Sequence, residues 1–195
     1  MSRKAAYGVL VTVLSWSIAS AVILPFGCPT QASVNSNVLS TYLTGTWYEY
    51  SRYTGFGKAY QCPSEAYKPA ATAGLYDVTR TWISGSGDAT TVKGQMKQAV
   101  PGGPEAVLSL LFSEAAYEGQ QNAITKANYH ILAYEVSNYA VVWDCISFFF
   151  FHIQTLRILT RVRVPADEVV AAAYKQANDR GIKTNFLRKN QQTNC

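Results

Sequence analysis

Four cysteines, Cys28, Cys62, Cys145 and Cys195, are the residues of this 195-residue chain with the most reactive side chains. None of their spacings is C-x-x-C, which argues against a zinc site and against a thioredoxin-type redox pair. In a secreted chain an even number of cysteines predicts two disulfides, and three pairings are then open. The cysteines therefore predict structural cross-links and no metal site.

Motifs for catalysis are missing from the sequence. The chain has only two histidines, His130 and His152, and contains neither a Gly-x-Ser-x-Gly nor a His-Glu-x-x-His motif. No pair of carboxylates shares an obvious strand face, as glycoside hydrolysis would require. We therefore expect a protein that is not an enzyme and that requires no cofactor.

The first 21 residues have the pattern of a secretory signal peptide. Arg3 and Lys4 form a basic start, an apolar stretch follows, and Ala19-Ser20-Ala21 fits the small-x-small cleavage pattern. We expect cleavage before Val22, a single domain over 22–195, and a secreted, extracellular protein. An uncleaved membrane anchor is the alternative, since the apolar stretch is nearly long enough to span a bilayer.

The charge of the chain is modest. Its formal net charge is +5, and loss of Arg3 and Lys4 with the signal peptide would leave 5 − 2 = +3. No platform of alternating aromatic and basic residues accompanies this charge, so a nucleic-acid partner is not expected. No later segment approaches membrane length, so stable insertion into a membrane is not expected either.

Short runs rich in Tyr, Val, Ile, Thr and Trp, separated by clusters of Gly, Pro, Asn and Ser, predict an all-β protein. Eight strands are expected, near 46–53, 64–69, 74–83, 90–98, 106–113, 127–135, 139–145 and 148–160. Their short connections favour an up-and-down antiparallel β-barrel, which leaves no exposed sheet edge. A barrel of eight strands is wide enough inside for side chains and one small ligand.

Three further segments flank the strands. The arm over 22–42 is expected to be irregular, and 182–186 to return as a short strand. A helix is predicted over 165–180, with Pro165 in its first turn and Gly181 after its end. Its apolar stripe consists of small residues, which suits a helix that lies flat on the outside of the barrel.

Gly45-Thr46-Trp47 opens the first predicted strand. Gly45 allows the backbone to enter the strand at a crowded turn, and Trp47 has an apolar face large enough to close one end of a barrel. Together with the signal, the eight strands and Arg161 ahead of the helix, this tripeptide resembles the first motif of the lipocalins. Ile158-Leu159-Thr160-Arg161 is similar to the third motif of that family, whereas Tyr134-Glu135-Val136 departs from the usual Thr-Asp-Tyr of the second.

Within the lipocalins the chain looks closest to the apolipoprotein D-like branch, which includes arthropod bilin-binding and carotenoid-binding members. The stretches that carry this resemblance are Gly27-Cys28-Pro29, Gln61-Cys62, 138–145, Phe151-His152 and Thr193-Asn194-Cys195. The resemblance implies disulfides Cys28–Cys145 and Cys62–Cys195, and a stack of Arg161 on Trp47 at the closed end of the barrel. It also implies a secreted carrier of a small hydrophobic ligand: a lipid, sterol, retinoid, or tetrapyrrole or carotenoid pigment.

Residues that line the interior are predicted from the alternation of side chains along a strand. Residues in phase with Trp47 and Arg161 should point inward, and the resemblance adds Tyr67 to the pocket. The predicted ligand-binding residues are Tyr53, Tyr67, Phe149, Phe151, Ile153 and Arg157. A buried Arg157 needs a partner, either Glu49 within the barrel or an acidic group of the ligand. A β-bulge would reverse these assignments locally.

The barrel entrance is expected at the loops 54–59, 84–88, 101–104 and 113–122. The alternative to a carrier is an extracellular interaction protein that acts through its loops or an exterior aromatic surface. Alternation leaves Phe148 and Phe150 outside, where they would be exposed or form a dimer contact. A monomer or a weak homo-oligomer is expected.

Overall fold

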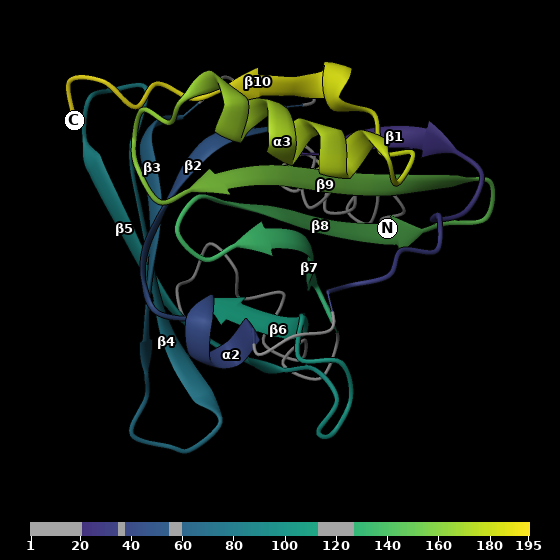
Figure 1. The fold of residues 1–195 in the computed structure, drawn as a ribbon, viewed down its shortest axis with the longest axis horizontal. Coiled ribbons are helices and arrows are strands. Elements are labelled where there is room, and N and C mark those ends of the chain that lie inside the picture. The colour runs from purple at the N-terminus through teal and green to yellow at the C-terminus, as the bar shows by residue number, and fades with distance from the viewer. Residues whose placement is uncertain (1–20, 35–37, 55–59, 113–126) are drawn as a thin grey trace, which may run out of the picture.

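The computed structural model describes residues 21–34, 38–54, 60–112 and 127–195 (Figure 1). The expected signal peptide therefore lies outside the described residues, apart from Ala21, and so do most of the expected entrance loops at 54–59 and 113–122.

Eight antiparallel strands form a closed barrel, as the sequence predicts. Each pairs with the next along the chain, and β9 pairs back with β2. The strands are β2 (Gly45–Tyr53), β3 (Gln61–Pro69), β4 (Leu75–Ile83), β5 (Ala89–Gln98), β6 (Val107–Phe112), β7 (Tyr129–Glu135), β8 (Tyr139–Ser147) and β9 (Phe151–Thr160). Closure pairs the two end strands of the sheet and so removes their free edges.

Four short elements flank the eight strands. In the arm expected to be irregular, β1 (Val22–Pro25) pairs with β9, and α2 (Val38–Thr41) precedes β2. At the other end of the chain a 3₁₀ turn, η3 (Thr184–Phe186), leads into β10 (Leu187–Lys189), which pairs with β2. The final strand thus lies a few residues later than expected. Both short strands pair with the ends of barrel strands that extend beyond the barrel pairing: β1 with the start of β9, and β10 with the end of β2.

A β-bulge changes the faces of β2. Glu49 lies opposite Leu159 and Ser51 opposite Ile158, so that Tyr50 is an extra residue without a partner on β9. Because side chains alternate along a strand, one extra residue exchanges the inner and outer faces beyond it. Arg52 therefore joins the inner face, whereas Ser51 and Tyr53 turn outward.

The helix α3 (Asp167–Asn178) lies on the outside of the barrel against β7 and β8 (Figure 1). Its small residues Ala173 and Ala177 are fully buried, and they pack with Trp143 and Leu156 in a second apolar core between helix and barrel. Gly181 ends the helix with a φ of +73°, and the Ile182 amide donates back to the Ala177 carbonyl. No helix in the described part of the chain is long and apolar enough to cross a membrane.

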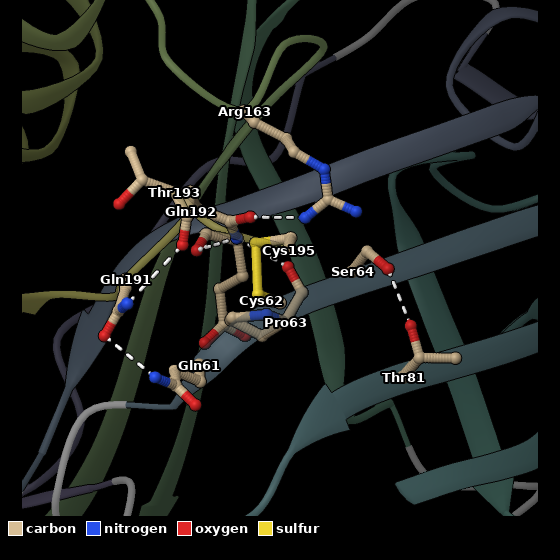
Figure 2. The surroundings of a disulfide bond; sticks show 11 residues. Gln61, Cys62, Pro63, Ser64, Thr81, Arg163, Gln191, Gln192, Thr193 and Cys195 are labelled. Carbon is tan, nitrogen blue, oxygen red and sulfur yellow. Dashed lines mark hydrogen bonds between the residues drawn. A yellow bond between two sulfur atoms is a disulfide. The ribbon is translucent and has the colours of Figure 1, made fainter. Parts of the chain in front are cut away.

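Two disulfides fasten the ends of the chain to the barrel. Cys28–Cys145 joins the N-terminal arm to β8, and Cys62–Cys195 joins the last residue to β3. This is the pairing that the resemblance implies. Around the second bridge, Gln192 donates to the Pro63 carbonyl at 2.7 Å and accepts from Arg163 at 3.0 Å (Figure 2). The C-terminal segment is thus held by hydrogen bonds as well as by a covalent link.

Candidate functional site

Trp47 closes one end of the barrel. Its side chain is fully buried and stacks on Tyr42 with ring centroids 5.1 Å apart. The indole Nε1 donates to the Tyr42 carbonyl at 2.9 Å. On the other side the Arg161 guanidinium lies 3.7 Å from the indole centroid, a cation–π contact that the resemblance implies.

Arg161 also binds the backbone around this end. Its Nε donates to the Val136 carbonyl at 2.9 Å, and its two Nη atoms donate to the carbonyls of Thr44 and Thr41 at 2.8 and 3.1 Å. The β7–β8 turn is thereby connected to the segment that enters β2. Gly45 has a φ of +68°, a backbone conformation that favours glycine. These residues therefore hold the closed end of the barrel together.

A buried carboxylate lies directly beside Trp47 inside the barrel. Glu65, on β3, is opposite Trp47 in the strand register and almost fully buried. It accepts a hydrogen bond from Arg80 Nε at 2.8 Å and further bonds from Arg80 Nη2, Arg157 Nη1 and the Tyr67 hydroxyl. Such charge-assisted bonds satisfy a carboxylate that has no access to water.

Three tyrosines complete the surroundings of Glu65. The hydroxyl of Tyr129 donates to Glu65 at 3.2 Å and lies 2.9 Å from that of Tyr67. It also bonds the hydroxyl of Tyr42, which in turn stacks on Trp47. The hydrogen-bonded group thus continues from Glu65 to the aromatic stack at the closed end.

The electrostatics keep Glu65 ionised and the tyrosines neutral. Burial alone would raise the pKa of Glu65, but the Arg157 and Arg80 guanidinium groups together outweigh burial, so that this pKa lies well below its ordinary range. Burial, together with the nearby negative charge of Glu65, raises the pKa of Tyr67 and Tyr129 above the ordinary tyrosine value.

A second carboxylate extends the charged group toward the open end. Glu49 Oε2 lies 3.6 Å from Arg157 Nη1, and Glu49 Oε1 lies 3.4 Å from Arg52 Nε. Asn190 Nδ2 donates to Glu49 Oε1 at 3.0 Å. We call the five ion-paired side chains the arginine–glutamate network; its members are Glu49, Arg52, Glu65, Arg80 and Arg157.

Aromatic side chains surround the network on the side away from Trp47. The Arg52 guanidinium lies 4.6 Å from the Tyr60 ring centroid, and Tyr60 contacts Trp82 with centroids 5.7 Å apart. Arg80 lies 4.8 Å from the centroid of Phe112. Tyr60 and Trp82 are half-buried, whereas the inward side chains near Trp47 are fully buried. The barrel interior thus changes from closely packed to partly accessible beyond the network.

The structure brings two of the six predicted ligand-binding residues together. Arg157 and Tyr67 are both buried inside the barrel and both bond Glu65. The prediction that Tyr53 points inward, in contrast, is wrong. Because of the bulge at Tyr50, Tyr53 faces outward into the core beneath α3, and its hydroxyl donates to the Lys183 carbonyl at 2.6 Å.

The remaining three predicted residues belong to the open end. Phe149 precedes β9, in the turn after β8, and its side chain is fully exposed (104%), so its assignment to the interior is incorrect. Phe151 and Ile153 lie where β9 pairs with β1, beyond the last pairing of β9 with β2 at Arg157, and both are half-buried. They are rim residues of the barrel.

One predicted entrance loop lies at the wrong end. Strands β5 and β6 meet at 101–104 on the same end of the barrel as the β3–β4 and β7–β8 turns, since the strands alternate in direction. This is the end that Trp47 closes. The loop at 84–88 lies at the opposite, open end.

Several interior residues were not predicted. Glu65 is in phase with Tyr67 on β3, and Arg80 and Trp82 are in phase with each other on β4, so alternation along these strands could have identified them. No comparable signal was available for Arg52, because the bulge reverses its face.

The two histidines lie outside the barrel: His130 contacts Trp143, and His152 Nδ1 lies 2.9 Å from the Phe26 carbonyl. In the described ranges no three His, Cys, Asp or Glu side chains are grouped so as to hold a metal ion.

Comparisons with known proteins identify the fold. No family model and no curated protein sequence matches the chain. Among solved structures, H1 crustacyanin from the lobster Homarus americanus has a TM-score of 0.68 at 20% identity, over 88% of this chain and 91% of that one. Insecticyanin from the tobacco hornworm Manduca sexta has a TM-score of 0.69 at 16% identity, over 87% and 88%. A siderocalin that functions through dual ligand specificities has a TM-score of 0.53 at 13% identity, over 76% and 93%.

The lobster and hornworm proteins are in keeping with the arthropod branch that the sequence resembles. At these identities the similarity is one of fold. The closed eight-stranded barrel, the external helix and the stack of Arg161 on Trp47 agree with it. The chain therefore has the lipocalin fold, as the resemblance in its sequence predicts.

Proposed function

We propose that this protein is a secreted carrier that holds a small hydrophobic ligand inside the open half of the barrel. The observation that carries the proposal is the contrast between the two halves. Inward side chains beside Trp47, such as Met96 and Leu108, have no exposed surface, whereas the inward aromatic side chains Tyr60 and Trp82 are only half-buried. Apolar surface that remains accessible inside a barrel favours binding of an apolar ligand by about 25 cal/mol per Å² buried.

Two further observations support the proposal. A structural neighbour is described as a siderocalin with dual ligand specificities, so this fold can serve ligand binding. Two disulfides, with no free cysteine among the described residues, fit an oxidising extracellular compartment. Lipids, sterols, retinoids, and tetrapyrrole or carotenoid pigments belong to the proposed ligand class. A bound pigment or lipid would be transported cargo and not a required cofactor.

The proposal is tested by titration of the purified protein with retinol, read through tryptophan fluorescence and checked by calorimetry. Saturable binding at micromolar concentration is expected.

Thr90 lies opposite Trp82 in the register and on the same face, whereas its neighbour Thr91 is exposed on the outside. Thr90→Phe should weaken binding at least about tenfold because it fills interior space, and Thr91→Phe should leave it unchanged. Equal effects of the two variants, or no saturable binding of any member of the proposed class, would contradict the carrier. An absorption spectrum of the natively purified protein would reveal a bound pigment.

A second function is favoured by the aromatic surface outside the barrel. Phe149 and Phe150 are exposed in the β8–β9 turn, and Phe26 next to them is 78% exposed; its amide donates to the Phe150 carbonyl at 2.9 Å. An exposed apolar patch of this kind is typical of an interaction site. Sedimentation of the purified protein tests this alternative: a dimer that becomes a monomer in Phe149→Ser supports an interaction protein, and a monomer at all concentrations speaks against self-association.

A further inference from the structure

The arginine–glutamate network contains one more positive than negative group. Three guanidinium groups face two carboxylates, so the network has a formal charge of 3 − 2 = +1. Glu65 is fully engaged by Arg80, Arg157 and the tyrosines. The excess positive charge is therefore not balanced at Glu65. A buried charge without a partner is unfavourable, and a bound group of opposite sign would relieve it.

Arg52 is the cation of the network with the fewest hydrogen bonds. Its Nε is buried and has no hydrogen-bond partner among the described residues, and the residue as a whole is only 9% exposed. Its contact with Glu49 is an ion pair at 3.4 Å, and the bond from Asn190 already occupies the same Glu49 oxygen. Arg157, in comparison, donates directly to Glu65. Among these guanidinium groups, Arg52 has the donor capacity that a ligand can use.

Arg52 also lies where a ligand would meet it. The residue is near the open end of β2, and its guanidinium lies over Tyr60, which contacts the half-buried Trp82. A cation at the base of an aromatic wall suits an amphiphile whose acidic end points inward and whose apolar body lies against Tyr60 and Trp82. A planar guanidinium also matches the geometry of a carboxylate, to which it can donate two parallel hydrogen bonds.

We infer that the ligand is a hydrophobic monocarboxylate and that Arg52 binds its carboxylate. The inference rests on the proposed carrier function and specifies its ligand class. The charge of +1 matches a single carboxylate, and binding would place that carboxylate at Arg52 with the apolar body against Tyr60 and Trp82.

Retinoic acid and retinol provide the test, since they share one apolar body and differ in the charged end. The unmodified protein is expected to bind the acid at least about tenfold more tightly than the alcohol, because only the acid gains charge-assisted bonds. Arg52→Met retains the length of the side chain and removes its charge, so it should weaken binding of the acid and abolish this preference. Arg52→Lys should retain part of the preference.

Arg163 provides the matched control. Its guanidinium lies 4.5 Å from the Tyr48 ring centroid, outside the barrel, and so repeats the Arg52–Tyr60 contact away from the proposed site. Arg163→Met should leave the preference for the acid intact. Equal affinities for acid and alcohol in the unmodified protein would overturn the carboxylate assignment while leaving the carrier in place. Persistence of the preference in a folded Arg52→Met would overturn the role of Arg52. Failure of both ligands to bind would overturn the carrier and, with it, this inference.

Discussion

Replacement of Glu65 by glutamine is expected to lower the free energy of unfolding by about 3–5 kcal/mol, the usual range for breaking a buried ion pair. Glu65 is almost fully buried and is bound by two guanidinium groups, so its neutralisation leaves the positive charges of Arg80 and Arg157 close together without the central negative charge. Equilibrium unfolding in urea near pH 7, with the disulfides intact, measures the loss.

The exposed pair Lys68–Asp77 provides the control for this prediction. Its atoms are 3.8 Å apart and both side chains are open to solvent, so Asp77→Asn should change stability by less than about 1 kcal/mol. A loss as small for Glu65→Gln as for Asp77→Asn would show that the network is not stabilised by Glu65.

The unmodified protein and Glu65→Gln should respond differently to acid. Because its pKa is lowered in the folded state, Glu65 stabilises the fold above the pKa of the unfolded chain, roughly 4–5, and this contribution is lost as the pH falls toward the folded value. The amide that replaces the carboxylate in the variant does not titrate. The stability difference between the two proteins should therefore narrow below about pH 4.5, and a constant difference would contradict the ionised state of Glu65.

Truncation of Trp47 to alanine is expected to have a similar effect, a loss of about 3–5 kcal/mol, as is usual for a large aromatic side chain in a core. The change removes the stack on Tyr42, the indole hydrogen bond to the Tyr42 carbonyl and the surface beneath Arg161. Denaturant unfolding followed by circular dichroism measures this loss of stability. This method does not depend on the fluorescence of the Trp47 indole, which the variant lacks.

Trp82→Ala is the matched control, because it removes the same side chain from the half-buried part of the barrel. Its destabilisation should be clearly smaller, whereas its effect on ligand binding should be the larger of the two. The reverse ranking would mean that Trp47, and not the open half, contacts the ligand.

Much of the fold could be predicted from the sequence because its signals are local. The strands β2 to β9 begin and end within a few residues of the expected bounds, since turn residues separate runs of β-branched and aromatic residues. The helix α3 is confirmed for the same reason. In contrast, β1 and β10 are short strands whose pairing depends on edges that exist only after the barrel has formed. No local pattern predicts β1, and the sequence pattern places the final strand a few residues too early, over 182–186.

The candidate site was predicted less completely. Arg157 and its need for an acidic partner could be inferred, because alternation on β9 is regular up to that residue. Its main partner is Glu65, however, and the expected Glu49 lies further away at 3.6 Å. Tyr53 was assigned to the wrong face because a bulge leaves no mark in hydrophobic periodicity. Phe149 was assigned to a strand because aromatic residues favour strands, yet here it lies in a turn.

The bulge at Tyr50 has a consequence for any alignment of this chain with distant relatives. A single extra residue determines whether Arg52 or Tyr53 lies inside the barrel. An alignment that ignores the bulge therefore pairs inward residues of one protein with outward residues of the other beyond Tyr50. At 16–20% identity an aligned column does not reveal such a shift. Pocket residues of these proteins therefore have to be matched by the direction in which each Cβ points, one strand at a time, before a ligand preference is inferred from them. By the same reasoning, deletion of Tyr50 would remove the bulge but keep Glu49 and Arg52 on the inner face, because Ser51 would then follow Glu49 in regular alternation.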